Sequence, residues 1–200
     1  MAIQGSDWQA VQAFRQAERR RLIDWRMSLS VAERADRSAR IMDGLTRTVT
    51  ARPGLVVSGY MPYRGEPDVR PWLSDLASSG VTTCLPVVTA RHAPLIFRSW
   101  TPGCRMERGA LGILAPADGD IVLPDIIIAP LVGFDSDFYR LGHGGGYFDR
   151  TLAALKPRAI LVIGVGYDHT RLETIFPQAF DIPMDMIITE SVLLGGGHRR

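Results

Sequence analysis

Residues 125–152 read DIIIAPLVGFDSDFYRLGHGGGYFDRTL, and the pattern of these residues indicates the fold class. It opens with an apolar, β-branched run over residues 125–129, which predicts a strand buried on both faces of a sheet. A turn-rich segment follows, and residues 147–155 predict a helix. A buried strand that leads through a long loop into a helix is typical of a mostly parallel α/β sheet. Ligands of such sheets bind beyond the carboxyl ends of the strands, so this loop is a candidate binding site.

The flanking segments repeat the alternation of helix and strand. Helices are predicted over residues 7–27, 30–50 and 68–79, the second from the capping-box signal of Ser30 and Glu33. Strands are predicted over residues 55–61, 81–85, 95–100, 159–165 and 186–189, with a loop or short hairpin over 101–123. We therefore expect one domain, residues 1–195, built as a three-layer helix–sheet–helix sandwich with two N-terminal helices packed on it. Residues 196–200 are expected to form a disordered tail.

The composition narrows the class of protein. The 200 residues are 46% hydrophobic and 22% charged, as in soluble globular proteins and unlike disordered or fibrous chains. No stretch approaches the roughly 20 apolar residues that span a bilayer, and the N-terminus lacks the order of a secretory signal. Cys84 and Cys104 are too few for a disulfide scaffold. We expect a cytoplasmic monomer with no membrane partner.

The charge is unevenly distributed along the chain. Lys156 is the one lysine among 23 basic residues, and many of the arginines lie between Arg15 and Arg52. Such a segment could bind nucleic acid, but interspersed acidic residues favour a solvated helix face, so we do not expect a nucleic-acid partner. A third possibility is that one or two of these arginines hold a phosphate.

Four glycines precede the predicted helix at residue 147, namely Gly142, Gly144, Gly145 and Gly146. A glycine-rich turn that feeds a helix N-terminus presents unpaired N–H groups and the positive end of the helix dipole, which suits phosphate oxygens. Arg140 and His143 could add positive charge, and Asp149 could hold Mg²⁺ against the same phosphates. The alternative is a tight surface turn with Asp149 as a helix-capping charge.

The string RLGHGGGYFDRTL, residues 140–152, closely resembles the signature of 5-formyltetrahydrofolate cyclo-ligases, also called methenyltetrahydrofolate synthetases. SGYMPYRGEPDV (58–69), FRSWTPG (97–103), GALGILAP (109–116) and DIPMDMIITE (181–190) resemble further segments of the same family, in the same order. The resemblance implies ATP- and Mg²⁺-dependent cyclisation of 5-formyltetrahydrofolate to 5,10-methenyltetrahydrofolate. ADP and phosphate would be released, and an N5-formyl (imidate) phosphate would be the intermediate.

The resemblance also implies roles for individual residues. ATP would be bound by Arg15, Arg19, Arg140, Leu141, Gly142, His143, Gly144, Gly145, Gly146 and Tyr147. The reduced folate would contact Met61, Glu66 and Tyr147, and Arg140 and Tyr147 would act in catalysis. Asp149 and Asp185 would hold the metal.

Several of these roles have simpler alternatives. Glu66 could be a solvated loop carboxylate, and Asp185 an ordinary residue at a strand start. Arg15 replaces a usual lysine, and Thr170 a usual glutamine. These departures leave room for a paralogue that binds ATP or folate but runs another phosphoryl transfer. A non-enzymatic basic-helix interaction module is the third possibility.

Overall fold

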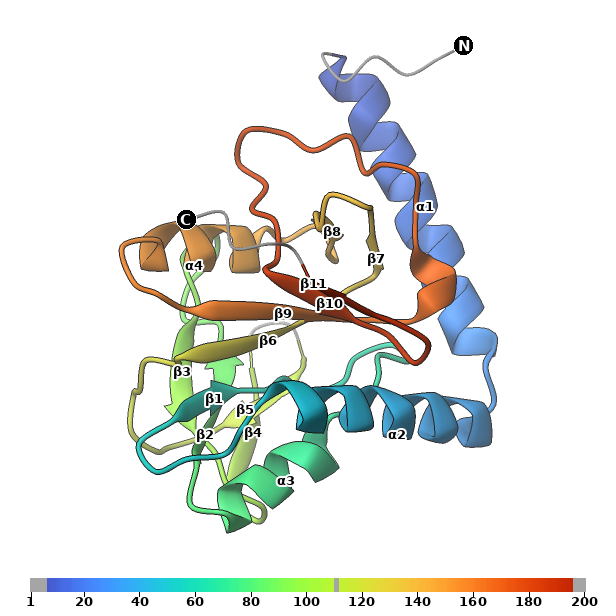
Figure 1. Cartoon of the computed structure of the whole chain (residues 1–200). Helices are drawn as coiled ribbons and strands as arrows, with labels where there is room; N and C mark the ends of the chain where they lie inside the picture. The colour runs from blue at the N-terminus through green and yellow to red at the C-terminus, as the bar shows by residue number, and fades with distance from the viewer. Residues whose placement is uncertain (1–6, 110–111, 196–200) are drawn as a thin grey trace.

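A seven-stranded sheet forms the centre of the protein, for which the computed structural model describes residues 7–109 and 112–195. The strand order is β11-β10-β9-β6-β1-β2-β3 (Figure 1). The five inner strands run parallel, whereas β11 and β3 pair antiparallel at the two edges. The strands are β1 (Val56–Ser58), β2 (Thr82–Val87), β3 (Ile96–Ser99), β6 (Ile126–Pro130), β9 (Leu161–Val165), β10 (Met186–Ile188) and β11 (Leu193–Gly195).

In the ranges described, four α-helices surround this sheet: α1 (Trp8–Ser28), α2 (Val31–Thr48), α3 (Arg70–Ser78) and α4 (Tyr147–Leu155). Helices α2 and α3 cover one face and α4 covers the other (Figure 1). The predicted α/β class, with a mostly parallel sheet and two N-terminal helices, is confirmed. The capping box is confirmed as well, since Ser30 accepts from the Glu33 amide and Glu33 accepts from the Ser30 amide.

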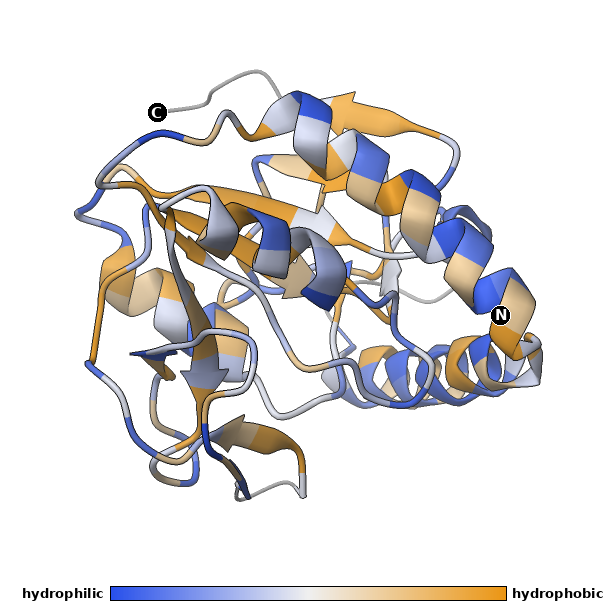
Figure 2. Ribbon diagram, turned by 90° about the horizontal axis from the view of Figure 1, so that it is seen from below, coloured by the Kyte–Doolittle hydropathy of each residue, from blue (hydrophilic) through white to orange (hydrophobic). Residues whose placement is uncertain are grey.

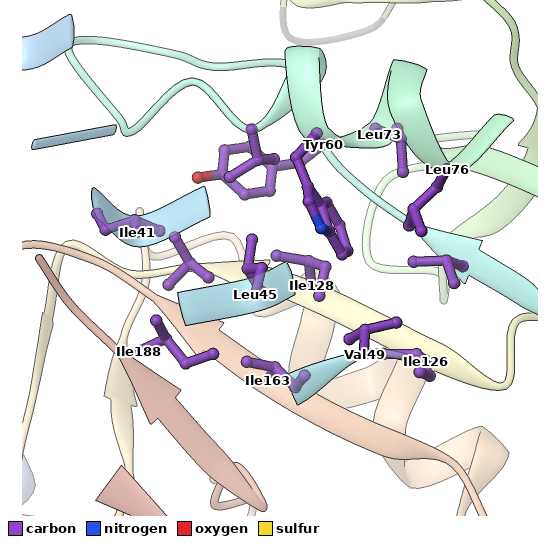
Figure 3. Close-up of a cluster of buried hydrophobic side chains, with 14 of the residues drawn as sticks. Ile41, Leu45, Val49, Tyr60, Leu73, Leu76, Ile126, Ile128, Ile163 and Ile188 are labelled. Atoms are coloured by element: carbon purple, nitrogen blue, oxygen red, sulfur yellow. The ribbon is translucent and has the colours of Figure 1, made fainter. Parts of the chain in front are cut away.

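Two apolar clusters join the helices to the sheet. On one face, side chains from α2 and α3 meet isoleucines of β6, β9 and β10 (Figure 3). On the other face, Phe148 and Leu152 of α4 lie against Ile127 and Ala129 of β6. The strands are apolar along most of their length and the helices are striped (Figure 2), which is the pattern of a sheet covered on both faces.

Helix α1 lies across the carboxyl ends of the parallel strands. Its Arg26 donates to the carbonyl of Leu131, just beyond β6, and to that of Arg64, in the turn after β1. Its Trp25 packs edge-on against Tyr167, just beyond β9, with ring centroids 5.8 Å apart. This helix therefore closes one side of the region where a ligand of a parallel sheet is expected.

The structure departs from the sequence predictions in the short elements. β1 ends at Ser58 rather than near residue 61, and the chain then turns, with the buried hydroxyl of Tyr60 donating to the Pro67 carbonyl at 2.8 Å. The hairpin β4 (Met106–Arg108) and β5 (Leu114–Pro116), the ribbon β7 (Gly133–Phe134) and β8 (Arg140–Leu141), and β11 complete the fold. The predicted tail, 196–200, lies outside the described residues. Within them, no helix combines the length and apolarity that crossing a membrane requires.

Candidate nucleotide and substrate cleft

A large open cleft of about 2500 Å³ lies next to α1 and extends from the carboxyl ends of the strands, past α4, to the residues at the start of β9 and β10. Its walls come from α1, the turn after β1, the glycine loop (residues 142–146), α4 and residues 179–185. It brings together all the residues that the sequence assigned to a site: Arg15, Arg19, Met61, Glu66, Arg140, Leu141, Gly142, His143, Gly144, Gly145, Gly146, Tyr147, Asp149 and Asp185. The elements that carry them are far apart in sequence.

The glycine loop has backbone N–H groups without partners. In the described part of the chain, no N–H group from residue 143 to 149 donates a hydrogen bond. No side chain of the described residues caps α4, whose N-cap residue Gly146 has φ of 65°. A Cβ at Gly142 would lie 2.5 Å from Nη1 of Arg140, so a larger residue there would collide with the guanidinium. Free amides at a helix N-terminus form a receptor for anionic oxygens.

Arg140 and Asp149 form an ion pair at the start of α4. Nη2 of Arg140 donates to Oδ2 of Asp149 at 2.9 Å, and the guanidinium lies 5.0 Å above the Phe148 ring. Burial lowers the pKa of Arg140, and the carboxylates of Asp149 and Asp181 oppose this shift. Nε of Arg140 is buried with no acceptor among the described residues. Such an orphaned donor costs free energy, and a phosphate oxygen would satisfy it.

Two more arginines border the glycine loop. Nε of Arg19 donates to the Gly142 carbonyl at 2.7 Å, while its terminal nitrogens have no acceptor among the residues described. Arg150 donates to the Gly145 carbonyl at 2.5 Å, and its guanidinium lies 5.2 Å from the Tyr147 ring centre. Sequence reasoning missed Arg150, although its place three residues after Tyr147 puts both on one face of the first helical turn.

Arg15 has a different environment from Arg19. Its Nε and Nη2 donate to the carbonyls of Ile175 and Phe176, each at 2.9 Å, and the side chain forms an ion pair with Asp181 at 2.5 Å. All three nitrogens of the guanidinium therefore have acceptors within the protein. Arg15 fastens residues 175–181 to α1 along one wall of the cleft, and its assignment to ATP stays a prediction.

The buried pair of Arg15 and Asp181 is expected to contribute to stability. Both side chains are less than 10% exposed. Asp181→Asn should lower the free energy of unfolding by about 3–5 kcal/mol, because removal of one partner leaves a buried charge uncompensated. Urea unfolding measures this change. Asp36→Asn is the matched control, since it breaks an ion pair with Arg40 whose side chains are 60% and 59% exposed. An equal, small loss of under about 1 kcal/mol in both variants would contradict the prediction.

Beside the glycine loop, Glu66 is buried rather than solvated. It is 6% exposed, so the alternative of a solvated loop carboxylate is wrong. Its Oε2 accepts from the Tyr63 amide at 2.9 Å, and its Oε1 lies 2.9 Å from Nε2 of His143 and 3.6 Å from Nη2 of Arg26. The turn that carries it is tight, with positive φ at Arg64 (47°) and Gly65 (74°). Sequence reasoning did not find Arg26, which lies on the predicted first helix.

Three other predicted site residues contact the cleft in different ways. Tyr147 is half-buried, and its hydroxyl has no hydrogen-bond partner in the described ranges. Met61 is half-buried between the cleft and the larger apolar cluster. Leu141 is 1% exposed and its carbonyl accepts from the Val132 amide at 2.8 Å, so it supports the loop from the ribbon below.

Asp185 lies at the start of β10. It is exposed, and its Oδ2 accepts from the Val162 amide at 2.8 Å. Asp185 therefore supports the start of the strand, as the simpler alternative expected. The assignment of Asp149 and Asp185 to the metal stays a prediction. Among the described residues, no group of three or more His, Cys, Asp or Glu side chains could hold a metal ion. Asp181 is the carboxylate that acts electrostatically on both Arg19 and Arg140.

Asp135, which follows Phe134 in the ribbon before the glycine loop, has a structural role. Asp135 is 2% exposed and accepts from the amides of Asp137, Tyr139 and Ile175, each at 3.1 Å. Burial raises the pKa of this carboxyl. Thr170, which stands where the family usually has glutamine, is also buried. Its hydroxyl donates to the Tyr167 carbonyl at 2.7 Å, so the shorter side chain has a hydrogen-bond partner close by in the chain.

The N-terminal arginines are largely engaged within the protein. Arg15, Arg19 and Arg26 bind groups in or beside the cleft, and Arg37 pairs with Glu190. Arg40 pairs with Asp36 on the same helix. This pattern argues against a continuous cationic face for nucleic acid.

Comparison with known proteins gives a consistent result. The family model described as "5-formyltetrahydrofolate cyclo-ligase family" matches residues 11–190. The 5-formyltetrahydrofolate cyclo-ligase of Escherichia coli (strain K12) is 32% identical over 155 residues, which cover 73% of this chain and 85% of that protein. The solved 5,10-methenyltetrahydrofolate synthetase of Aquifex aeolicus is 29% identical, with a TM-score of 0.76 over 93% of this chain and 95% of that one. The enzyme of the same name from Mycoplasma pneumoniae is 25% identical, with a TM-score of 0.71 over 88% and 98%.

Proposed function

The chain belongs to the 5-formyltetrahydrofolate cyclo-ligase family, and we propose that it uses ATP and Mg²⁺ to close 5-formyltetrahydrofolate to 5,10-methenyltetrahydrofolate. The observation that carries the proposal is the pairing of two features in one cleft. One is a glycine loop with free amides and an orphaned arginine nitrogen in the described part of the chain, and the other is a buried carboxylate, Glu66, which contacts the loop through His143.

The loop side suits the phosphates of ATP. Free amides of the glycine loop, Nε of Arg140 and the terminal nitrogens of Arg19 are donors that lack acceptors among the described residues. Arg150 adds a further cation beside the loop. Phosphoryl transfer depends mainly on positioning and on neutralising negative charge, and it needs no protein nucleophile.

The surroundings of Glu66 suit the reduced pterin. A carboxylate with four lone-pair sites accepts several N–H donors, and the described residues supply only part of the donors that Glu66 can take. The N–H edge of a pterin is a donor of this kind. Met61 supplies an apolar contact nearby, and Tyr147 would lie between the folate and the nucleotide.

The proposed reaction has two steps. The formyl oxygen attacks the γ-phosphorus of ATP, the bond to the leaving ADP oxygen breaks, and an N5-formyl (imidate) phosphate forms. N10 then attacks the activated formyl carbon and loses its proton, the carbon–oxygen bond breaks, and phosphate leaves as the ring closes. In both steps Arg140 and the glycine-loop amides would hold phosphate oxygens while charge moves onto them.

Asp149, with Asp185 as a second candidate, would hold Mg²⁺ beside the phosphates. Carboxylates together with substrate phosphates are the ordinary ligands of this ion. The ion would supply neutralisation of phosphate charge. The cytoplasmic, monomeric state expected from the sequence stays a prediction.

The test is the near-ultraviolet absorbance of methenyltetrahydrofolate, followed with purified protein, 5-formyltetrahydrofolate and Mg²⁺, with and without ATP. An absorbance rise that depends on ATP is expected. No rise, with ATP still bound in calorimetry, would point to a paralogue with another phosphoryl-transfer reaction. If the absorbance does not rise and the protein does not bind ATP, the proposal is overturned.

A further inference from the structure

We propose that Arg26 and His143 are positioning residues for Glu66, and that the His143–Glu66 contact couples the nucleotide side of the cleft to the folate side. This inference rests on the proposed function, because it takes the glycine loop as the phosphate site and Glu66 as the folate-binding carboxylate. The sequence assigned His143 to ATP, but its side chain, like that of Arg26, has its polar contacts elsewhere. Their contacts point instead to Glu66.

Arg26 holds the turn that carries Glu66. Its side chain is 1% exposed, on the part of α1 that crosses the strand ends. Nε donates to the Arg64 carbonyl at 2.6 Å, Nη2 to the Tyr63 carbonyl at 3.2 Å, and Nη1 to the Leu131 carbonyl at 3.3 Å. One guanidinium thus ties the turn after β1 to the end of β6. Its charge also lies 3.6 Å from the Glu66 carboxylate.

His143 fixes the other side of the same carboxylate. Its Nε2 lies 2.9 Å from Oε1 of Glu66 and 3.2 Å from Nη2 of Arg26. A guanidinium only donates and a carboxylate only accepts, so Nε2 can make a hydrogen bond to only one of them in a given tautomer. We assign the tautomer from the shorter contact, in which a protonated Nε2 donates to Glu66. The ring also packs edge-on against Tyr63, with centroids 5.4 Å apart, which limits its rotation.

His143 is also part of the glycine loop. Its own N–H is among those with no acceptor in the described ranges, so one residue offers its backbone to a phosphate and its side chain to Glu66. A phosphate that fixes the backbone of residue 143 would also hold Nε2 of His143 in place as the donor to Glu66. Coupling of this kind is reciprocal, so each ligand should tighten the binding of the other by the same factor.

The decisive experiment compares His143→Leu with His143→Gln in the full chain. Calorimetry measures the dissociation constant of 5-formyltetrahydrofolate with and without Mg²⁺ and a non-hydrolysable ATP analogue. In the unmodified protein we expect the analogue to tighten folate binding about fivefold or more. His143→Leu, which removes the donor, should weaken folate binding about tenfold and bring the coupling ratio close to 1. His143→Gln keeps an N–H donor, so this variant should keep most of the folate affinity and most of the coupling ratio of the unmodified protein.

Arg26 is tested by Arg26→Lys, which keeps the charge but cannot donate to three carbonyls at once. We expect weaker folate binding, by about tenfold, with binding of the ATP analogue alone nearly unchanged. Arg21→Gln is the matched control on the same helix, because Arg21 is exposed and pairs with Glu18 away from Glu66. If Arg26→Lys does not fold, the two His143 variants decide.

The outcomes separate this inference from the proposed function. An unmodified protein that neither binds ATP nor closes the ring would contradict the proposed function. An active unmodified protein whose folate affinity and coupling ratio are the same in His143→Leu would overturn the inference alone. Equal losses in His143→Leu and His143→Gln would also overturn it, since they would show that the ring is needed only for packing.

Discussion

Arg140→Ala is expected to lower kcat/KM by about a thousandfold, because in the proposed site this side chain would donate to the phosphate in transfer. Arg140 is 8% exposed, and its Nε has no acceptor in the described part of the chain. A buried guanidinium acts in a medium of low dielectric, where its attraction for developing negative charge is stronger than in water. The absorbance assay for ring closure gives kcat and KM, and calorimetry gives the affinity for the ATP analogue, which should fall at least about tenfold.

Two further variants show what the guanidinium supplies. Arg140→Lys keeps a positive charge but loses the planar fork, so it should fall between the unmodified protein and Arg140→Ala. Arg105→Ala removes an arginine that is 73% exposed and paired with Asp118, and it should leave all parameters unchanged. Unchanged affinity of Arg140→Ala for the ATP analogue would show that the phosphate site is assigned to the wrong residues.

The sequence predicted the regular elements well, because their signals are local. The capping box of Ser30 and Glu33 fixes the start of α2, and the apolar run at 125–129 becomes the strand β6 at the centre of the sheet. Residues 147–155 form α4 with the predicted bounds. Short elements were missed, since β11 has three residues and its pairing with β10 depends on tertiary contacts.

The residues that line the cleft could be predicted from the sequence, but their hydrogen-bond and ion-pair partners could not. The glycines and Arg140 lie together in one motif, so their proximity follows from the sequence. Arg15 instead takes partners on residues 175–181, and nothing local indicates that its nitrogens are already bound. Arg26 and Glu66 lie on different elements, and only the packing of α1 across the strand ends buries them together.

Asp149→Asn is expected to lower kcat by about a hundredfold or more at moderate Mg²⁺, with partial recovery as Mg²⁺ is raised. Asparagine keeps the shape of the side chain and an oxygen that can accept from Arg140, but it loses the charge that attracts the ion. The measurement is the initial rate of ring closure against Mg²⁺ at fixed ATP, together with the affinity for ATP without Mg²⁺. We expect the midpoint of the Mg²⁺ titration to rise in this variant.

Asp149 has a competing role that the same titration distinguishes. Its Oδ2 accepts from Arg140 at 2.9 Å and its Oδ1 from the Ile182 amide at 3.4 Å, so it could serve only to neutralise Arg140. In that case Asp149→Asn would remove the charge that neutralises the guanidinium, strengthen ATP binding without Mg²⁺, and leave the midpoint unchanged. That result would remove Asp149 from the metal site.

Asp185→Asn tests whether Asp185 holds Mg²⁺ together with Asp149. Its Oδ2 accepts from the Val162 amide at 2.8 Å, and asparagine retains an oxygen that can make this contact. A residue that only begins β10 should therefore tolerate the change with the Mg²⁺ midpoint unaltered. If the midpoint rises in both variants, two carboxylates hold the ion. If it rises only in Asp149→Asn, the ion depends on one carboxylate and on the phosphates of ATP, and its affinity should then follow the concentration of nucleotide.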